Sequence, residues 1–165
     1  MELLLVVDMQ EGFRCSESEE ILPNLLKLKE NFTGKLVFTK FMNRKNSLFV
    51  KQLKWDKFRN EKQQKILSEL EPVDNTIEHT KYTTLNNRLQ ELLEKNNIEK
   101  VYLGGIYTDV CILKTAMDLF DFGIETFVIE DVCTSLHGEK NHDFAINTLS
   151  HILGQNHITK LSKMV

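Results

Sequence analysis

Short hydrophobic runs along this chain alternate with longer segments in which hydrophobic residues recur every three to four positions. The short runs predict buried strands and the longer segments predict amphipathic helices. Strands are expected at residues 3–8, 35–41, 75–79, 100–103, 125–130 and 157–161. Helices are expected at residues 23–32, 86–96, 110–122 and 139–153, with further helices of unassigned ends within 47–70.

This alternation of strands and helices favours a parallel sheet covered by helices on both faces. We therefore expect an α/β fold with three α/β/α layers and a six-stranded, mostly parallel sheet in the order 3-2-1-4-5-6. A length of 165 residues fits a single domain, residues 1–165. No low-complexity linker or internal repeat divides the chain.

Composition narrows the function classes. The formal net charge of −3 gives no reason to expect binding to nucleic acid or to an anionic membrane. No apolar run reaches the ~18 residues needed to span a bilayer, and the first residues lack the basic flank of a signal peptide. The three cysteines are widely spaced and form no Cys-x-x-Cys pair, which argues against a disulfide framework or a structural zinc site. We expect a cytoplasmic protein.

Residues that directly follow the predicted strands are the first candidates for a functional site. In open parallel sheets, sites form beyond the carboxyl ends of the strands. Asp8, Lys81 and Cys111 all occupy such positions. A thiol nucleophile needs a proton acceptor and a cation nearby, and these three side chains supply one of each kind.

Cys111 lies where a predicted strand passes through two glycines into a predicted helix. A helix N-terminus carries about half a positive charge and favours the thiolate, which is the nucleophilic form of cysteine. We therefore expect a reactive thiol. For Cys15 and Cys133 we expect buried, unreactive side chains.

Three motifs give the chain a family resemblance. They are Val-Asp-Met-Gln-Glu-Gly-Phe at 7–13, His-Thr-Lys-Tyr-Thr-Thr-Leu at 79–85, and the turn and helix at 104–118. In this order they resemble the isochorismatase-like cysteine hydrolase superfamily, which includes nicotinamidases and N-carbamoylsarcosine amidohydrolases. The segment 130–135 is also similar to the end of that family's fifth strand. The resemblance covers nearly the whole chain.

The resemblance implies a role for each of these residues. Cys111 would attack an amide-type carbonyl to form a thioester, and Asp8 would take the thiol proton and pass it to the leaving amine. Lys81 would stabilise the thiolate and the charge of the acid. The family also has a cis peptide bond in this turn, here before Tyr107. That bond would aim the backbone N–H groups of Tyr107 and Cys111 at the developing oxyanion.

Departures from the family pattern concern metal binding and the substrate pocket. Metal-binding nicotinamidases carry an Asp-x-His after the second strand, whereas residues 39–44 contain neither Asp nor His. We therefore expect no metal and no cofactor, and nicotinamide becomes a poor first choice of substrate. Thr83–Leu85 and Tyr107 also differ from the family pattern, which would reshape the pocket.

For several other residues the sequence allows two interpretations. Phe13, Trp55 and Tyr107 are candidates to line the substrate pocket, although Phe13 also suits the core. Gln10 is expected either to bind substrate or to hydrogen-bond the turn after the first strand. Two further alternatives involve single residues: Lys40 competes with Lys81 as the basic residue, and Asp109 is a candidate helix cap.

Taken together, the residues predict a hydrolase that cleaves a small amide or carbamoyl-type C–N bond through a thioester. Two alternatives stay open. One is a non-catalytic relative that binds a metabolite or partner in the same crevice, and the other is an isochorismatase-type vinyl-ether hydrolase. The expected partner is a small-molecule substrate, and the resemblance implies a homo-oligomer, either a dimer or a tetramer.

Overall fold

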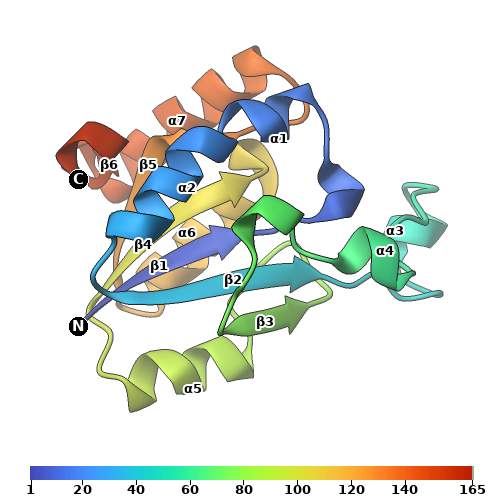
Figure 1. Ribbon diagram of the computed structural model, residues 1–165, viewed down its shortest axis with the longest axis horizontal. Coiled ribbons are helices and arrows are strands. Elements are labelled where there is room, and N and C mark those ends of the chain that lie inside the picture. The colour runs from blue at the N-terminus through green and yellow to red at the C-terminus, as the bar shows by residue number, and fades with distance from the viewer. Residues whose placement is uncertain (165) are drawn as a thin grey trace.

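The computed structural model describes residues 1–164 and contains a six-stranded sheet in the order β3-β2-β1-β4-β5-β6, which confirms the predicted fold class. All five pairs of neighbouring strands are parallel. Figure 1 shows the arrowheads of β1 to β4 directed toward the same end of the molecule, where α3 and α4 also lie. The strands are β1 Glu2–Val7, β2 Lys35–Phe41, β3 Thr76–His79, β4 Lys100–Ile106, β5 Glu125–Thr134 and β6 Ile158–Thr159.

Helices occupy most of the connections between the strands. The α-helices are α1 Ser16–Glu20, α2 Leu22–Asn31, α3 Leu48–Lys51, α4 Glu61–Gln64, α5 Asn87–Lys95, α6 Leu113–Asp121 and α7 Glu139–Leu153. Short 3-10 turns are η1 Glu11–Phe13, η2 Ser68–Leu70, η4 Gln155–His157 and η5 Leu161–Lys163. The segment η3, Thr108–Ile112, is π-helical and leads directly into α6.

The largest departure from the predicted elements lies between β2 and β3. The only α-helices described between residues 47 and 70 are α3 and α4, of four residues each. Charged residues interrupt the apolar positions there, so no continuous helical face forms. The aromatic side chains of this segment instead pack across the end of the sheet, where Trp55 lies 5.7 Å from Phe41 between ring centroids.

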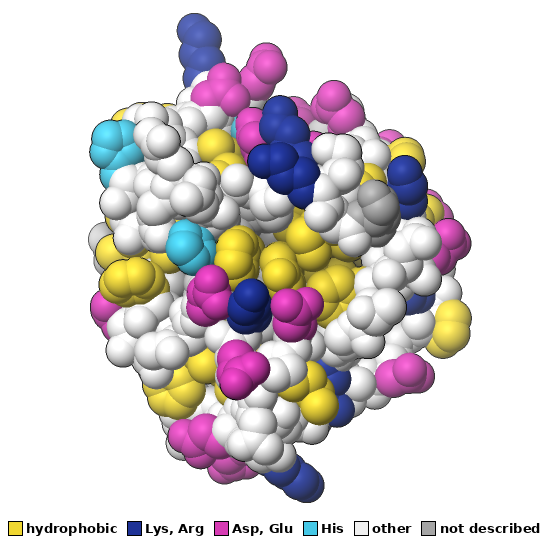
Figure 2. Space-filling model, turned by 90° about the vertical axis from the view of Figure 1, so that its left-hand side faces the viewer, with side chains coloured by type: hydrophobic (Ala, Val, Ile, Leu, Met, Phe, Trp, Pro, Cys, Tyr) yellow, Lys and Arg dark blue, Asp and Glu magenta, His cyan; other side chains and the backbone are white. Residues whose placement is uncertain are grey.

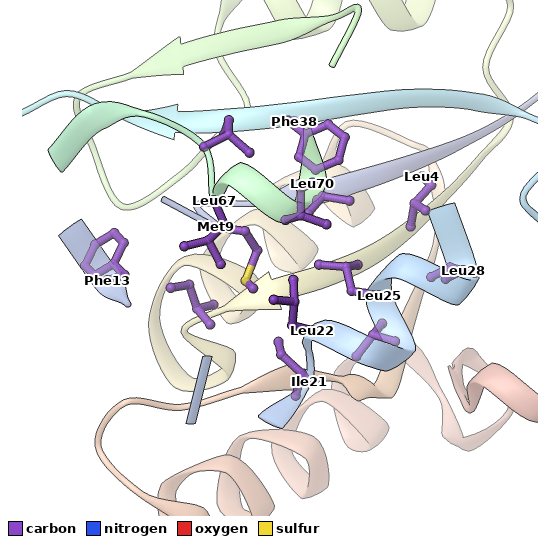
Figure 3. Packing of buried hydrophobic residues seen from close by; sticks show 14 of the residues in the cluster. Leu4, Met9, Phe13, Ile21, Leu22, Leu25, Leu28, Phe38, Leu67 and Leu70 are labelled. Atoms are coloured by element: carbon purple, nitrogen blue, oxygen red, sulfur yellow. The ribbon is translucent and has the colours of Figure 1, made fainter. Parts of the chain in front are cut away.

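The alternation of side chains along β1 divides the core into two layers. Leu4 and Val6 belong to the cluster that includes α2 and the segment around η2. Leu3, Leu5 and Val7 belong to the cluster that includes α5, α6 and α7. Figure 3 shows the first cluster, in which leucines of α2 face Leu4, Phe38 and Leu70. Because both faces are covered, β1 is apolar from Leu3 to Val7, as expected for a central parallel strand.

The two ends of the sheet differ in character. Figure 2 shows the end at which the strands begin, where side chains of both charges surround a small apolar area. The Lys100–Glu125 ion pair, with an N–O distance of 3.7 Å, belongs to this end. The opposite end, at the carboxyl ends of the strands, carries the candidate site. No helix within residues 1–164 is long and apolar enough to cross a bilayer.

The strand order reverses between β1 and β4, which is where sites form in open parallel sheets. β1 and β4 are paired along their length, with Val7 opposite Gly105. Gly105 has φ +113°, and a Cβ atom there would lie 2.1 Å from the Val7 carbonyl oxygen. A glycine at this position therefore allows the two central strands to pair just before the turn that carries Cys111.

Replacing Gly105 by Ala should destabilise the fold strongly, because a rigid backbone atom blocks the new Cβ. We expect the free energy of unfolding, measured by urea denaturation, to fall by about 4 kcal/mol or more. Gly123→Ala is the matched control, since Gly123 also has positive φ but has no atom within 4 Å of the added Cβ. Gly123→Ala should lower the free energy of unfolding by about 1–2 kcal/mol. Equal losses in the two variants would contradict the proposed close approach.

Candidate active site

Asp8 directly follows β1 and is fixed by the neighbouring strand β2. Its backbone adopts φ +54°, which is uncommon for a residue other than glycine, and only 1% of its surface is exposed. The Asp8 N–H donates to Thr39 Oγ1 at 3.1 Å, and the Thr39 hydroxyl donates to Asp8 Oδ1 at 2.6 Å. The carboxylate is thereby held in one orientation at the end of the sheet.

His79 ends β3 and is the second neighbour of the Asp8 carboxylate. Its Nε2 lies 2.7 Å from Asp8 Oδ1, and its Nδ1 lies 2.8 Å from the Lys81 carbonyl oxygen. Burial lowers the pKa of His79, but the Asp8 charge and the hydrogen bonds raise it by more, so the pKa lies above its usual value. The other oxygen, Asp8 Oδ2, is buried without a hydrogen-bond partner among residues 1–164.

Cys111 lies in η3, close to the Asp8 carboxylate. Burial raises the pKa of the thiol well above its usual value, and the nearby Asp8 charge raises it further. A hydrogen bond from the Tyr107 N–H acts in the opposite direction. The resting group is therefore a neutral thiol, in contrast to the thiolate expected from the helix start. The free Asp8 oxygen is the group available to accept its proton.

The Ile106–Tyr107 peptide bond is cis, as the resemblance implied. The Tyr107 N–H faces the Cys111 sulfur. The Tyr107 phenol is partly buried, which raises its pKa to about 12, so the ring carries a neutral hydroxyl.

Lys81 follows β3 and lines the same cavity as Asp8 and Cys111. Its side chain is exposed, and its ammonium is not within 4.0 Å of any carboxylate of the described residues. The structure thus places all three predicted catalytic residues around one cavity, while His79 takes the direct contact with Asp8. Lys40, the competing basic residue, pairs with Glu78 at 4.0 Å and does not line the cavity.

The cavity in front of Cys111 measures about 340 Å³ and is walled mainly by aromatic rings. The predicted pocket residues Phe13, Trp55 and Tyr107 all line it. The Phe13 ring lies 5.5 Å from the Tyr107 ring and 6.2 Å from the Trp55 ring, measured between centroids. Further walls come from Phe41, Phe49, Leu53, Tyr82, Val110 and His137.

A second hollow of about 570 Å³ adjoins the cavity on the side of α3. The two share Phe49, Leu53, Lys81 and Tyr82 as walls. The second hollow also contacts Arg44 and several polar residues but touches neither Asp8 nor Cys111. It is the larger of the two, yet the reactive groups lie in the first.

Gln10 does not line the cavity, so the substrate-binding role left open for it is not the one the structure shows. Its side-chain amide donates to the carbonyl oxygens of Phe41 and Gln64 at 3.1 and 3.0 Å. Its Oε1 accepts from the Phe41 N–H at 2.8 Å. Gln10 therefore links the ends of β1 and β2 to Gln64 at the end of α4. This agrees with the second interpretation, in which Gln10 hydrogen-bonds the turn after the first strand.

Asp109 is not a helix cap, since η3 has no side-chain cap. Its carboxylate accepts from Ser135 Oγ at 2.6 Å and lies 2.7 Å from His137 Nδ1. His137 in turn lines the cavity with its ring 5.0 Å from the Tyr107 ring. Nothing in the local sequence indicates that the loop after β5 folds back over η3, so the sequence gives no signal that His137, although exposed, borders the cavity.

His79 is the other site residue that sequence reasoning missed as a site member, and here a signal was available. His79 is the last residue of β3, whereas Lys81 lies in the loop that follows. The rule that sites form at the carboxyl ends of parallel strands therefore applies to His79 as much as to Lys81.

The residues after β2 do not fit the metal site of metal-binding relatives. Asn43 occupies that region, and its amide donates to the carbonyl oxygens of Trp55 and Lys57 at 3.2 and 3.0 Å. Its Oδ1 accepts from the Ser47 hydroxyl. Among the residues that the structure describes, no group of three His, Cys, Asp or Glu side chains is arranged to hold a metal ion.

Comparisons with known proteins bear on the family and the fold of the chain. A relative from Rattus norvegicus, isochorismatase domain-containing protein 2, is 37% identical over 76 residues, which are 46% of this chain and 36% of that protein. The matched stretch thus spans about a third of this curated relative. An isochorismatase-like hydrolase from Alkaliphilus metalliredigens superimposes with a TM-score of 0.87 at 22% identity, covering 98% of this chain and 96% of the other.

A second solved structure is N-carbamoylsarcosine amidase from Thermoplasma acidophilum. It superimposes with a TM-score of 0.84 at 20% identity and covers 97% of this chain and 96% of its own. At such identities the structures establish the shared fold. The family model described as the isochorismatase domain matches residues 2–159, nearly the whole chain. The protein therefore belongs to the isochorismatase family.

Proposed function

We propose that this protein is a cysteine hydrolase that cleaves a small amide or carbamoyl-type C–N bond through a thioester on Cys111. The observation that carries the proposal is the shared cavity, which brings one thiol, one carboxylate and one ammonium together in front of aromatic walls. The fold is also that of a solved structure named as an amidase.

The chemistry begins with a neutral thiol next to a carboxylate oxygen that has no other hydrogen bond within residues 1–164. The Cys111 proton passes to Asp8 as the sulfur attacks the substrate carbonyl carbon. The C–N bond then breaks, and Asp8 returns the proton to the leaving nitrogen. Water attacks the thioester, with Asp8 again accepting a proton, and releases the carboxylic acid and the free thiol.

Two groups would stabilise the negative charge that develops in these steps. The backbone N–H groups of Tyr107 and Cys111 would donate to the oxyanion, each contributing about 3 kcal/mol in the transition state. The Lys81 ammonium would add a positive charge at the cavity wall. Together with a bound substrate, the aromatic walls would keep water away from the reacting groups, which would strengthen these electrostatic interactions.

The cavity walls indicate the class of substrate. Six of the twelve lining residues are aromatic, and of the others only Asp8, Lys81 and His137 carry titratable groups besides the Cys111 thiol. A volume of about 340 Å³ accommodates a small molecule rather than the end of a polymer chain. We therefore propose an uncharged primary amide or carbamoyl compound with a compact apolar or aromatic body.

Replacing Cys111 by Ala should reduce turnover of such amides by about 10⁴-fold or more, because the nucleophile is lost. Ammonia release from a panel of small aromatic and aliphatic amides is the measurement. Intact-protein mass spectrometry of acid-quenched wild-type reactions should show the acyl group, and the Ala variant should not. Melting temperatures confirm that both proteins are folded.

Each competing function gives a different result in this experiment. Ammonia release that survives in the Ala variant would reject the thioester mechanism. Turnover of a vinyl ether without ammonia release would favour isochorismatase-type chemistry. Binding without turnover by the wild-type protein would favour a non-catalytic relative.

Replacing Asp8 by Asn should make Cys111 more reactive toward alkylation while turnover falls. The Asp8 charge raises the pKa of the thiol, so its removal lowers that pKa and increases the thiolate fraction at a given pH. Peptide-level mass spectrometry should show iodoacetamide labelling of Cys111 several-fold faster than in wild type, although a lower pKa also weakens each thiolate. Turnover should fall about 10²–10⁴-fold with the loss of the base. Slower labelling in the Asn variant would contradict the inference that Asp8 raises the pKa of the Cys111 thiol.

Trp55 should report directly on occupancy of the cavity, because it is the single tryptophan of the chain and lines the site. In the Cys111→Ala protein, aromatic amides should change its fluorescence in a saturable way. Trp55→Ala should raise KM for aromatic amides about tenfold, since the lost ring buries substrate surface. Phe144→Ala is the control, because Phe144 is 69% exposed on α7 and does not line the cavity. An unchanged KM in Trp55→Ala would place the substrate elsewhere.

A further inference from the structure

The hydrogen-bond partners of His79 fix where its protons are. Nδ1 faces the Lys81 carbonyl oxygen at 2.8 Å, and a carbonyl oxygen can only accept a hydrogen bond. Nδ1 therefore carries a proton. Nε2 faces Asp8 Oδ1 at 2.7 Å, so a second proton must lie between the ring and the carboxylate. The Asp8 charge raises the pKa of His79, which favours that proton on the ring, so the pair is an imidazolium and a carboxylate.

The two carboxylate oxygens of Asp8 differ in their hydrogen bonds. Thr39 donates its hydroxyl proton to Oδ1, which also receives His79 Nε2. Oδ1 thus has two donors, whereas Oδ2 has none among residues 1–164. The oxygen left for the Cys111 proton is therefore Oδ2. An isolated buried carboxylate would be strongly unfavourable, and the contact at Oδ1 provides its compensation.

We propose that His79 is a positioning residue of this site, which holds Asp8 through an imidazolium–carboxylate pair and leaves Oδ2 free to accept the thiol proton. This inference rests on the proposed function. The resemblance assigns the stabilisation of the acid's charge to Lys81, but its ammonium does not lie within 4.0 Å of Asp8. In this chain the direct partner of the acid is a histidine, and Lys81 remains for the charge that develops on substrate and sulfur.

Few other groups influence the charge of His79. Asp8 reaches it from the end of β1, and the Lys81 carbonyl from the loop after β3. On β2, the Phe41 ring lies 5.6 Å from the His79 ring between centroids. Thr39, also on β2, hydrogen-bonds to Asp8. The Lys81 and Cys111 side chains line the cavity beside Asp8. Among residues 1–164, Asp8 is thus the only charged side chain in direct contact with the His79 ring, in agreement with the raised pKa of His79.

The proposal predicts an alkaline loss of activity. As pH rises through the pKa of His79, which lies above its usual value of 6.5, the imidazolium loses its proton. Because Nδ1 keeps its proton for the Lys81 carbonyl, the Nε2 lone pair then faces the carboxylate and repels it. Turnover should be retained below that pKa and fall above it.

The first test observes His79 itself and needs no substrate. Proteins labelled with ¹⁵N and ¹³C histidine are titrated by NMR. In wild type, the pKa of His79 should lie above the usual histidine value of 6.5. In Asp8→Asn the pKa of His79 should fall by about one to three pH units, since only burial then acts strongly on it. In Lys81→Met the pKa of His79 should change little. A wild-type His79 that is already neutral at pH 6.5 would overturn the proposal.

The second test uses two variants that each keep one of the two contacts. His79→Gln can donate a neutral N–H to Asp8, whereas His79→Asn can reach the Lys81 carbonyl but not Asp8. The Gln variant should keep measurable turnover and KM but lose the alkaline fall. The Asn variant should lose kcat on the order of 10²-fold, because the base is misplaced. A residue that merely shapes the loop after β3 would give the opposite ranking, and that result would contradict the proposal.

Controls separate this inference from the proposed function. His151→Gln should match wild type in both activity and pH profile. Melting temperatures of the Gln and Asn variants establish folding, and the iodoacetamide rate of Cys111 gives a readout without turnover. If no amide is hydrolysed, the NMR titration still decides whether the His79–Asp8 pair exists. If amides are hydrolysed but His79 is neutral, the function stands and the positioning role is rejected.

Discussion

The structure depends on a carboxylate that is buried at the junction of three strands. Asp8 is 1% exposed and would be costly in that place without partners. Thr39 from β2 and His79 from β3 provide them, and both bind the same oxygen. The consequence is an asymmetric carboxylate, one oxygen of which is saturated while the other is left next to a thiol. A general base in this position needs that asymmetry, because an oxygen with two donors is a poor proton acceptor.

The order of the strands explains why these groups meet. β1 lies between β2 and β4, so the residue after β1 is next to side chains from both neighbours. The Val7–Gly105 pairing brings the end of β4 close, and η3 then places Cys111 beside Asp8. Gln10 adds a third link by binding backbone groups of Phe41 and Gln64. The backbone register of the parallel strands therefore determines where the site residues lie relative to one another.

Much of this arrangement could be predicted from the sequence because it follows from periodicity. The apolar runs gave six strands, and the rule that sites follow strand ends selected Asp8, Lys81 and Cys111, all of which line the cavity. Properties set by contacts distant in sequence could not be read in this way. The charge state of Cys111 depends on burial by elements far along the chain, which outweighs its position at a helix start. The dimer or tetramer implied by the resemblance stays a prediction.

A neutral thiol at rest is compatible with catalysis because the base beside it is already fixed. In a cavity walled by Phe13, Trp55 and Tyr107, a permanent thiolate would lack solvation and would be exposed to oxidation. In the proposed mechanism, keeping the proton on sulfur until a carbonyl is in place would confine the reactive form to the moment of attack. The transfer would then move a negative charge from Asp8 to the sulfur and on to the carbonyl oxygen. The cationic groups remain in place throughout, with His79 behind the carboxylate and Lys81 at the cavity wall, so little reorganisation accompanies the step.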